Sequence, residues 1–279
     1  MCDTCGCNVT HANQHLLLGD GHLAHTSNGS ASIEVLKGLL DANDHQAEHN
    51  RQHFAEHNVL AVNLMSSPGA GKTALLEATI DALRESYRIA VIVGDLETDN
   101  DARRLRQHGA SAIQISTGNA CHLDAHMVHM ALHDLDLHAL DIVFIENVGN
   151  LVCPASFDLG QHRNVTLLSS PEGDDKPQKY PVMFREADLL LLTKSDLTPL
   201  LGDFVPQRAE QCLRELANDA PVIELSSRSG AGMNEWIRWL EQSLQLERAK
   251  IRDDTVMHKG VGGHGGAHGR GRGRGHSHG

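Results

Sequence analysis

An apolar run leads directly into a glycine-rich loop in the first third of the chain. Residues 59–65 form the run, and the loop reads Ser66-Ser67-Pro68-Gly69-Ala70-Gly71-Lys72-Thr73. Small residues let backbone N–H groups surround an anion, and apolar residues at helical spacing over 74–83 place the positive end of a helix dipole beside it. Lys72 is positioned to reach the β- and γ-phosphates of a nucleotide, and the Thr73 hydroxyl to ligate Mg²⁺. Ser66 stands where the strict pattern has glycine, but the flanking strand and helix still predict a phosphate-binding loop.

Six further apolar runs alternate with helical patterns or loops along the rest of the chain. They are residues 89–93, 112–115, 141–145, 165–168, 188–192 and 222–225. Such runs are typical of a parallel sheet that helices bury on both faces. We therefore predict an α/β fold over residues 58–248, a three-layer P-loop NTPase with a mostly parallel sheet. A connecting helix is expected over 31–57, and flexible metal-binding segments over 1–30 and 249–279.

The charge and apolar content of the chain exclude several classes of protein. A formal net charge of −12 over 279 residues argues against a general nucleic-acid binder, because the phosphate backbone favours a basic surface. No apolar run approaches the ~18 residues of a membrane span, and the N-terminus lacks the apolar core of a signal peptide. We therefore expect a cytoplasmic protein. Thiols stay reduced in that compartment, so the six cysteines are interpreted as metal ligands, catalysts or core residues before disulfides.

Polar residues follow three of the predicted strands, at the edge where open α/β sheets bind ligands. Asp95 and Glu146 are carboxylates that could hold Mg²⁺ directly or through water, and Gly149 can bring its N–H toward a γ-phosphate. Each acid alone is more often a turn former or a helix cap. The Asp196 carboxylate can accept from N1–H and the exocyclic amine of guanine, while the Lys194 stem lies along the purine. The set predicts binding of GTP in preference to ATP.

Three thiols lie within the first seven residues, at Cys2, Cys5 and Cys7. Gaps of one and two residues let a short loop place its sulfurs around one soft or borderline cation. A fourth position stays open, and the N-terminal amine would fill it if Met1 is removed, giving a square-planar set that suits nickel or copper. The alternative is a frayed terminus with isolated thiols.

Histidines recur in two other parts of the chain. Four of them are spaced by four residues along the predicted first helix: His45, His49, His53 and His57. Imidazole pairs at this spacing can chelate a transition metal, and a solvated polar face explains the spacing equally well. The segment after Met257 is rich in glycine, histidine and arginine and cannot form a core. It suggests metal buffering, contact with nucleic acid or acidic surfaces, or an inert tail.

Several stretches resemble the motifs of P-loop GTPases. Residues 63–73 resemble the phosphate motif, Thr193-Lys194-Ser195-Asp196 the guanine-specificity motif, and residues 225–233, with Ser227, the motif behind the base. Residues 118–124 and 172–181 narrow the resemblance to the hydrogenase nickel-incorporation GTPases, the HypB family of the SIMIBI class. The three N-terminal cysteines match the tight nickel site of that family.

The resemblance implies a dimerising GTPase that loads nickel into the large-subunit precursor of nickel–iron hydrogenase, together with other nickel-insertion accessory proteins. It assigns catalytic and switch roles to Lys72, Thr73, Asp95 and Glu146. It implies nucleotide contacts at Gly69, Ala70, Gly71, Lys72, Thr73, Ala74, Gly149, Lys194, Asp196 and Ser227. Thr193 replaces the asparagine of the general motif, which is expected to loosen a loop contact. With no arginine finger or water-orienting residue assigned, GTP hydrolysis is expected to be slow.

A second metal site is predicted from Cys121, His122 and Cys153. Cys153 follows Gly149 by four residues, so the segment between them would link a γ-phosphate sensor to a thiol. One protomer leaves this set short of a closed tetrahedron, and the resemblance implies that two protomers complete it. Further histidines follow along the same helix: His126, His129 and His133. Either Ni²⁺ or Zn²⁺ suits the ligands, and the alternative is that both cysteines are buried core residues.

Two other functions remain open. A related metallochaperone GTPase could serve urease or a cobalamin enzyme. The GTPase motifs alone do not distinguish such a protein from a hydrogenase GTPase. The N-terminal cysteines and the Cys121–His122 pair favour hydrogenase. A P-loop kinase for a small molecule would need an acceptor pocket and a basic lid, and neither is evident in the sequence.

Overall fold

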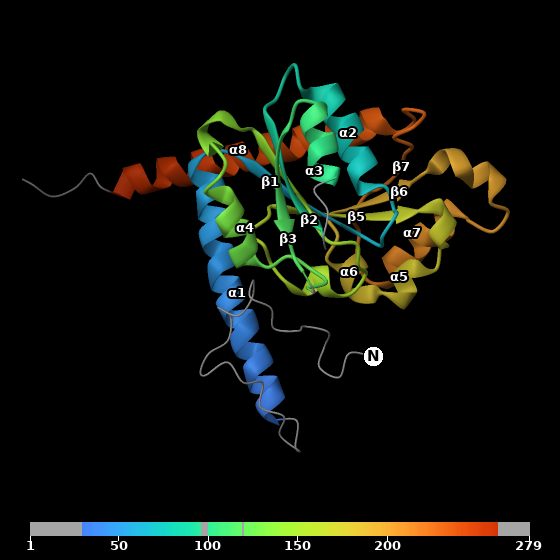
Figure 1. Ribbon diagram of the computed structural model, residues 1–279, viewed down its shortest axis with the longest axis horizontal. Helices are drawn as coiled ribbons and strands as arrows, with labels where there is room; N and C mark the ends of the chain where they lie inside the picture. Colours follow the sequence, from blue (N-terminus) through green and yellow to red (C-terminus); the bar gives the residue numbers. More distant parts are fainter. Residues whose placement is uncertain (1–29, 96–99, 119, 262–279) are drawn as a thin grey trace, which may run out of the picture.

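A parallel sheet forms the centre of the protein. The computed structural model describes residues 30–95, 100–118 and 120–261. Within them the sheet has seven strands in the order β3-β2-β4-β1-β5-β6-β7, and helices cover both faces (Figure 1). The strands are β1 (Leu60–Ser66), β2 (Ile89–Asp95), β3 (Ser111–Ser116), β4 (Ile142–Glu146), β5 (Arg163–Ser169), β6 (Leu189–Thr193) and β7 (Val222–Glu224). Each coincides with a predicted apolar run, so the three-layer α/β fold is confirmed.

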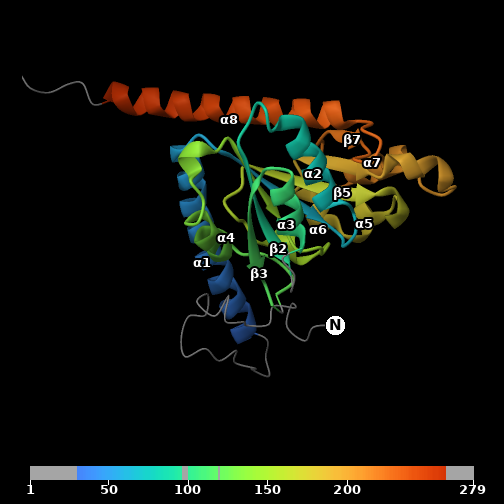
Figure 2. The same ribbon diagram turned by 45° about the horizontal axis from the view of Figure 1, so that its top comes forward.

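Two long helices flank the sheet at the two ends of the described chain. They are α1 (Ser30–Glu56) and α8 (Met233–Val261), and both extend past the sheet (Figure 2). The shorter helices are α2 (Lys72–Leu83), α3 (Asn100–Gln107), α4 (Ala125–Leu132), α5 (Lys176–Lys179), α6 (Pro181–Arg185) and α7 (Pro206–Glu215). The helix predicted before the first strand is therefore present. No helix in the described part of the chain is long and apolar enough to cross a bilayer.

Side chains of the central strand β1 alternate between two buried layers. Leu60 and Leu64 pack in the layer that contains α2 and α8, where Trp236 is fully buried. Ala61 faces the opposite layer and packs with Phe54 of α1 and with α4. This alternation follows from the period of two along a strand, and it explains why a strand buried on both faces appears as a continuous apolar run.

The last helix is longer than the sequence predicts. The domain is expected to end at residue 248, but α8 continues to Val261. At that point Arg248 donates from Nη2 to Asp141 Oδ1 at 2.5 Å and from Nε to Asn58 O at 3.2 Å, which binds α8 to the sheet. The described helix therefore runs thirteen residues past the predicted end of the domain.

Other predictions concern residues outside the described ranges. The thiols of Cys2, Cys5 and Cys7 and the histidines after residue 261 belong to them, as does most of the loop after Asp95. The sites built below use only the described residues.

Candidate functional site

The glycine-rich loop curls in front of α2. Gly69 has a φ of +76° and Gly71 a φ of +98°, conformations that residues with a Cβ rarely adopt. Lys72 is buried at the start of α2, and its Nζ donates to Ser66 Oγ at 2.8 Å. Ser66 therefore supplies a hydroxyl acceptor to the lysine at the position where the strict pattern has glycine. Burial lowers the pKa of Lys72, and the nearby carboxylate of Glu146 opposes this shift.

A carboxylate at the end of β4 faces the first turn of α2. Thr73 Oγ1 donates to Glu146 Oε1 at 2.8 Å. Burial raises the pKa of Glu146 to about 7, against the opposing effects of Lys72 and of the Thr73 hydrogen bond. The other oxygen, Oε2, is buried and has no hydrogen-bond partner among the described residues. A hard divalent cation takes oxygen ligands of this kind, so the pair fits Mg²⁺.

A cavity of about 440 Å³ opens in front of the loop. Asp95, at the end of β2, lines it beside Glu146, as the sequence predicts for two neighbouring strand ends. Asp101 and Arg104 of α3 also line it, although no sequence motif assigns them a role. The Arg104 guanidinium donates to both carboxylate oxygens of Glu77, at 2.9 and 3.0 Å, and to Asp101 Oδ1 at 3.1 Å. The Arg104 side chain in the wall of this cavity is therefore held by ion pairs to two carboxylates.

The segment after β4 packs directly on the phosphate-binding loop. A Cβ added to Gly149 would lie 2.8 Å from the Cα of Pro68. The backbones of the two segments are therefore in close contact at this point, with no space for a side chain between them. On the opposite side of the loop, Ser67 Oγ is hydrogen-bonded to Glu172, which also accepts from the Ser169 backbone N–H at 2.9 Å. Sequence reasoning did not assign Glu172 a role, although it stands within the stretch 172–181 that resembles HypB proteins.

The predicted guanine motif lies at the ends of β6 and β7. Lys194 adopts a left-handed conformation with φ +57°, and Asp196 Oδ1 accepts from Ser226 Oγ at 2.6 Å. Ser226, the residue before the predicted nucleotide contact Ser227, therefore holds the Asp196 carboxylate. Thr193 Oγ1 donates to Ala70 O at 2.6 Å in a buried contact. Threonine at this position therefore still contacts the phosphate-binding loop.

The cysteine and histidine residues predicted as metal ligands lie close together. The ligand atoms of Cys121, His122 and Cys153 all lie within 4.8 Å of one another. Cys121 and His122 lie in the loop before α4, whose N-cap is Asp124, and not on the helix itself. Three ligands leave a tetrahedral ion one open position.

His122 is held in the form that binds metals. It is buried, and its ring stacks on Phe157 with centroids 4.0 Å apart. Burial lowers the pKa of His122 to about 4, so the imidazole is neutral near pH 7. Cys121 Sγ lies 3.7 Å from His122 Nδ1, which is close to the ~3.5 Å expected for a sulfur and a nitrogen that share one tetrahedral ion. The residues therefore fit a borderline cation such as Ni²⁺ or Zn²⁺.

Comparisons with known proteins identify the family of this chain. The CobW/HypB/UreG nucleotide-binding domain family matches residues 60–224. The hydrogenase maturation factor HypB of Azotobacter vinelandii is 50% identical over 227 residues, which cover 81% of this chain and 74% of that protein. This chain belongs to the HypB family. HypB of Escherichia coli K12 is 48% identical over 231 residues, covering 80% of this chain and 79% of its own length.

A solved HypB structure shows the same fold. HypB from Helicobacter pylori, in complex with nickel, is 38% identical and superposes with a TM-score of 0.71. The match covers 74% of this chain and 97% of the other. Membership of a nucleotide-binding family that includes HypB disfavours the small-molecule kinase.

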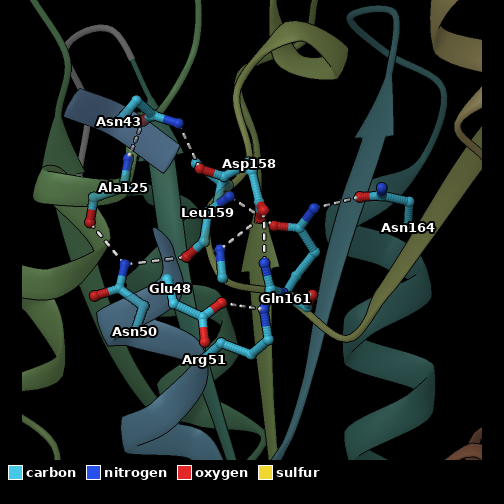
Figure 3. Close-up of polar contacts among 10 residues, drawn as sticks. Asn43, Glu48, Asn50, Arg51, Ala125, Asp158, Leu159, Gln161 and Asn164 are labelled. Carbon is cyan, nitrogen blue, oxygen red and sulfur yellow. Dashed lines mark hydrogen bonds and ion pairs between the residues drawn. The ribbon is translucent and has the colours of Figure 1, made fainter. Parts of the chain in front are cut away.

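In this HypB family member, α1 is hydrogen-bonded to both segments that follow the predicted metal ligands (Figure 3). Asn43 accepts from the Ala125 N–H at 2.9 Å and donates to Asp158 O at 2.8 Å. Asn50 donates to Ala125 O at 2.7 Å and to Leu159 O at 3.0 Å. Ala125 follows the Cys121–His122 loop, and residues 158–159 follow Cys153. Each asparagine therefore bridges the two arms of the site.

A buried amide links the nucleotide side of β4 to the metal side. Asn147 follows Glu146 directly, and its Oδ1 accepts from the backbone N–H groups of Leu123 at 3.1 Å and Val148 at 3.0 Å. Leu123 is the residue after His122. Its side chain also fills the space where a Cβ on Gly94 would be, with Leu123 Cγ only 2.7 Å away. The residue after Glu146 is therefore hydrogen-bonded to the backbone directly after His122.

Proposed function

We propose that this protein is a GTP-hydrolysing nickel chaperone that helps insert nickel into nickel–iron hydrogenase precursors. The relatives are named hydrogenase maturation factors, and a neighbouring structure holds nickel. One contact carries the proposal for this chain: Asn147, the residue after the proposed switch carboxylate Glu146, accepts through Oδ1 from the N–H of Leu123, the residue after His122. The nucleotide site and the metal site of this proposal are therefore connected through the residues at the end of β4. We place this work in the cytoplasm, with other nickel-insertion proteins as partners.

GTP occupies the cavity in front of α2 in this proposal. Backbone N–H groups of residues 69–74 and Lys72 hold its phosphates, Asp95 and Glu146 respond to the γ-phosphate, and Lys194 and Asp196 select guanine. Mg²⁺ would lie near Thr73 and Glu146 and would neutralise charge on the β- and γ-phosphates. Arg104 is tied to Glu77 and Asp101, so it does not act as a free arginine finger. Hydrolysis without an activating partner should therefore be slow.

The cargo binds to Cys121, His122 and Cys153. Zn²⁺ competes with Ni²⁺, because both accept imidazole and thiolate ligands. We propose that a second protomer approaches this face and shields or completes the three-ligand set. Val152, next to Cys153, is 56% exposed and offers an apolar contact for such a homodimer.

The decisive experiment measures Ni²⁺ affinity in two nucleotide states. The full chain carries Cys2→Ser, Cys5→Ser and Cys7→Ser so that only the inner thiols report through their charge-transfer absorption. Affinity should differ between GDP and a non-hydrolysable GTP analogue, by roughly 5- to 150-fold for an ordinary coupling of 1–3 kcal/mol. Nickel should change the affinity for the analogue by the same factor. Equal nickel affinities in both states would rule out the coupled function.

Asn147→Ala tests the path of the coupling. The variant leaves the N–H groups of Leu123 and Val148 without their acceptor, so the coupling factor should fall toward one while each site still binds its ligand. A matched control is Asn218→Ala, since Asn218 donates to the carbonyls of Phe184, Arg185 and Ala187 in a remote part of the domain. Both variants should lose ~1–3 kcal/mol of stability, but only Asn147→Ala should lose coupling. Full coupling in Asn147→Ala would refute the path.

A further inference from the structure

Histidines of two helices gather on the outer surface of the metal side. α4 lies beside α1 (Figure 1), and the ring of His129 on α4 lies between His53 of α1 and His133, the residue that follows α4. The ring centroids of His129 and His133 are 4.7 Å apart, and those of His53 and His129 are 5.5 Å apart. This cluster is separate from Cys121, His122 and Cys153, and nothing in the proposed function uses it.

The two α4 imidazoles present nitrogens to each other at a ligating distance. His133 Nε2 lies 3.3 Å from His129 Nε2. Two imidazoles that bind one ion at ~2.0–2.1 Å in tetrahedral geometry place their nitrogens about 3.3 Å apart. Residues four apart on a helix share one face, so the pair needs no rearrangement of the backbone to chelate an ion.

The tautomer of His129 is fixed by Asn50. The Asn50 amide nitrogen donates to Ala125 O and Leu159 O, so the Asn50 oxygen is the atom that faces His129 Nδ1 at 3.1 Å. Oδ1 can only accept, and His129 Nδ1 must therefore carry the proton. That leaves a lone pair on Nε2, directed toward His133. A ring whose far nitrogen donates to an oxygen is the usual arrangement of a metal-bound histidine.

The charge on the cluster also favours a neutral, ligating ring. Burial lowers the pKa of His129, and the imidazoles of His133, His53, His126 and His49 lower it further. Protonated rings would repel one another at these distances, whereas neutral rings around one cation would not.

We propose that His129 and His133, with His53 of α1 as third ligand, form an imidazole site for a divalent transition metal such as Zn²⁺ or Ni²⁺. The site shares an anchor with the thiol site, because Asn50 also holds the backbone segments that follow Cys121–His122 and Cys153. An ion held there lies on the helix that begins three residues after His122. The assignment does not depend on GTP binding or on nickel delivery.

The test follows histidine ring nitrogens by NMR in the full chain during a Zn²⁺ titration. The Cys2, Cys5, Cys7, Cys121 and Cys153 positions carry serine, so thiols do not compete. The Nε2 signals of His129 and His133, assigned from single His→Asn variants, should shift together and saturate. His133→Asn should weaken the zinc response of His129 roughly tenfold or more, since even loss of an outer partner costs 10–100-fold. His53→Asn should have a similar effect.

Fold and histidine number are controlled separately. His133 is exposed at the end of α4, so the metal-free stability of His133→Asn should match that of the parent protein. His108→Asn is the matched control, because His108 pairs with Asp81 on another surface. The proposal is overturned if the His129 and His133 signals stay unchanged while zinc binds elsewhere, which would leave a plain His–His hydrogen bond. It is also overturned if His133→Asn and His108→Asn change the zinc response of the His129 signal equally. An unaltered zinc response in His53→Asn would contradict the assignment of His53 as third ligand.

Discussion

Replacement of Glu146 by glutamine should change how the stability of the nucleotide-free protein depends on pH. Burial holds the pKa of this carboxyl at about 7, against an ordinary value of 4.5. Below the ordinary value both the folded and the unfolded chain hold the proton, so burial carries no charge penalty. As the pH rises toward 7, the unfolded chain releases the proton and the folded chain retains it, so native stability falls. Above the folded pKa the full penalty is present.

The size of the effect follows from the shift. The rise of the Glu146 pKa from 4.5 to about 7 corresponds to roughly 3 to 4 kcal/mol, because a tenfold change in a proton-binding constant is worth ~1.4 kcal/mol. Glu146→Gln carries no titrating group at this position, and its amide oxygen can still accept from Thr73. The stability of the variant relative to the native protein should therefore rise by about 3 kcal/mol between roughly pH 4.5 and 8. Any constant cost of burying the amide nitrogen does not alter this slope.

Urea unfolding in a metal chelator, without nucleotide, measures the difference at several pH values. Glu85→Gln controls for the removal of one carboxylate, since the Glu85 side chain is 91% exposed. Addition of Mg²⁺ and GDP should reverse the preference, because the ionised carboxylate then faces a cation. Binding near pH 7 should therefore release a proton from the native protein and not from the variant, which calorimetry in buffers of different ionisation enthalpy detects. A stability difference that does not grow with pH would refute the reasoning.

Two further predictions concern the nucleotide. Asp196→Asn should lower GTP affinity roughly 10- to 100-fold, because a hydrogen bond to a charged group is worth that much. The variant should instead favour xanthosine triphosphate, which competition binding would show. Equal binding of ATP and GTP by the native protein would contradict this prediction. Gly149→Ala should lose ~1–3 kcal/mol of stability and weaken binding of the GTP analogue, because its Cβ meets the Pro68 backbone at 2.8 Å. Gly202→Ala is the control for unfolding and titration, since a Cβ there meets nothing within 4 Å, and similar losses in both variants would disprove the contact argument.

The sequence was sufficient for the strands and for the prediction that Cys121, His122 and Cys153 lie close together. Buried parallel strands appear as apolar runs, and the phosphate loop has a spacing that few other structures need. Thiols and imidazoles at strand ends meet because parallel strands end at one edge of the sheet. The sequence was less informative elsewhere: no motif assigned a role to Asp101 and Arg104, which line the nucleotide cavity, and α8 continues for thirteen residues beyond 248, the predicted end of the domain.

The contacts of α1 have no counterpart in a sequence pattern. Asn43 and Asn50 bind backbone carbonyls of residues that are 75 to 115 positions away. A backbone carbonyl is the same chemical group at every position, so the partner carries no identity that the sequence could reveal. Only the packing of α1 against the loops determines which carbonyls these amides reach.

A polar residue inside an apolar strand is more informative. Asn63 is fully buried in the middle of β1, where an amide without partners would cost several kcal/mol. Its neighbour in the β5 register is Asn164, and the two side chains are hydrogen-bonded at 3.1 Å. Asn147 donates to Asn63 from the other side at 3.4 Å. The interruption of the run at residue 63 therefore predicts polar partners on adjacent strands, and following it leads from the centre of the sheet to the amide that holds the backbone beside His122.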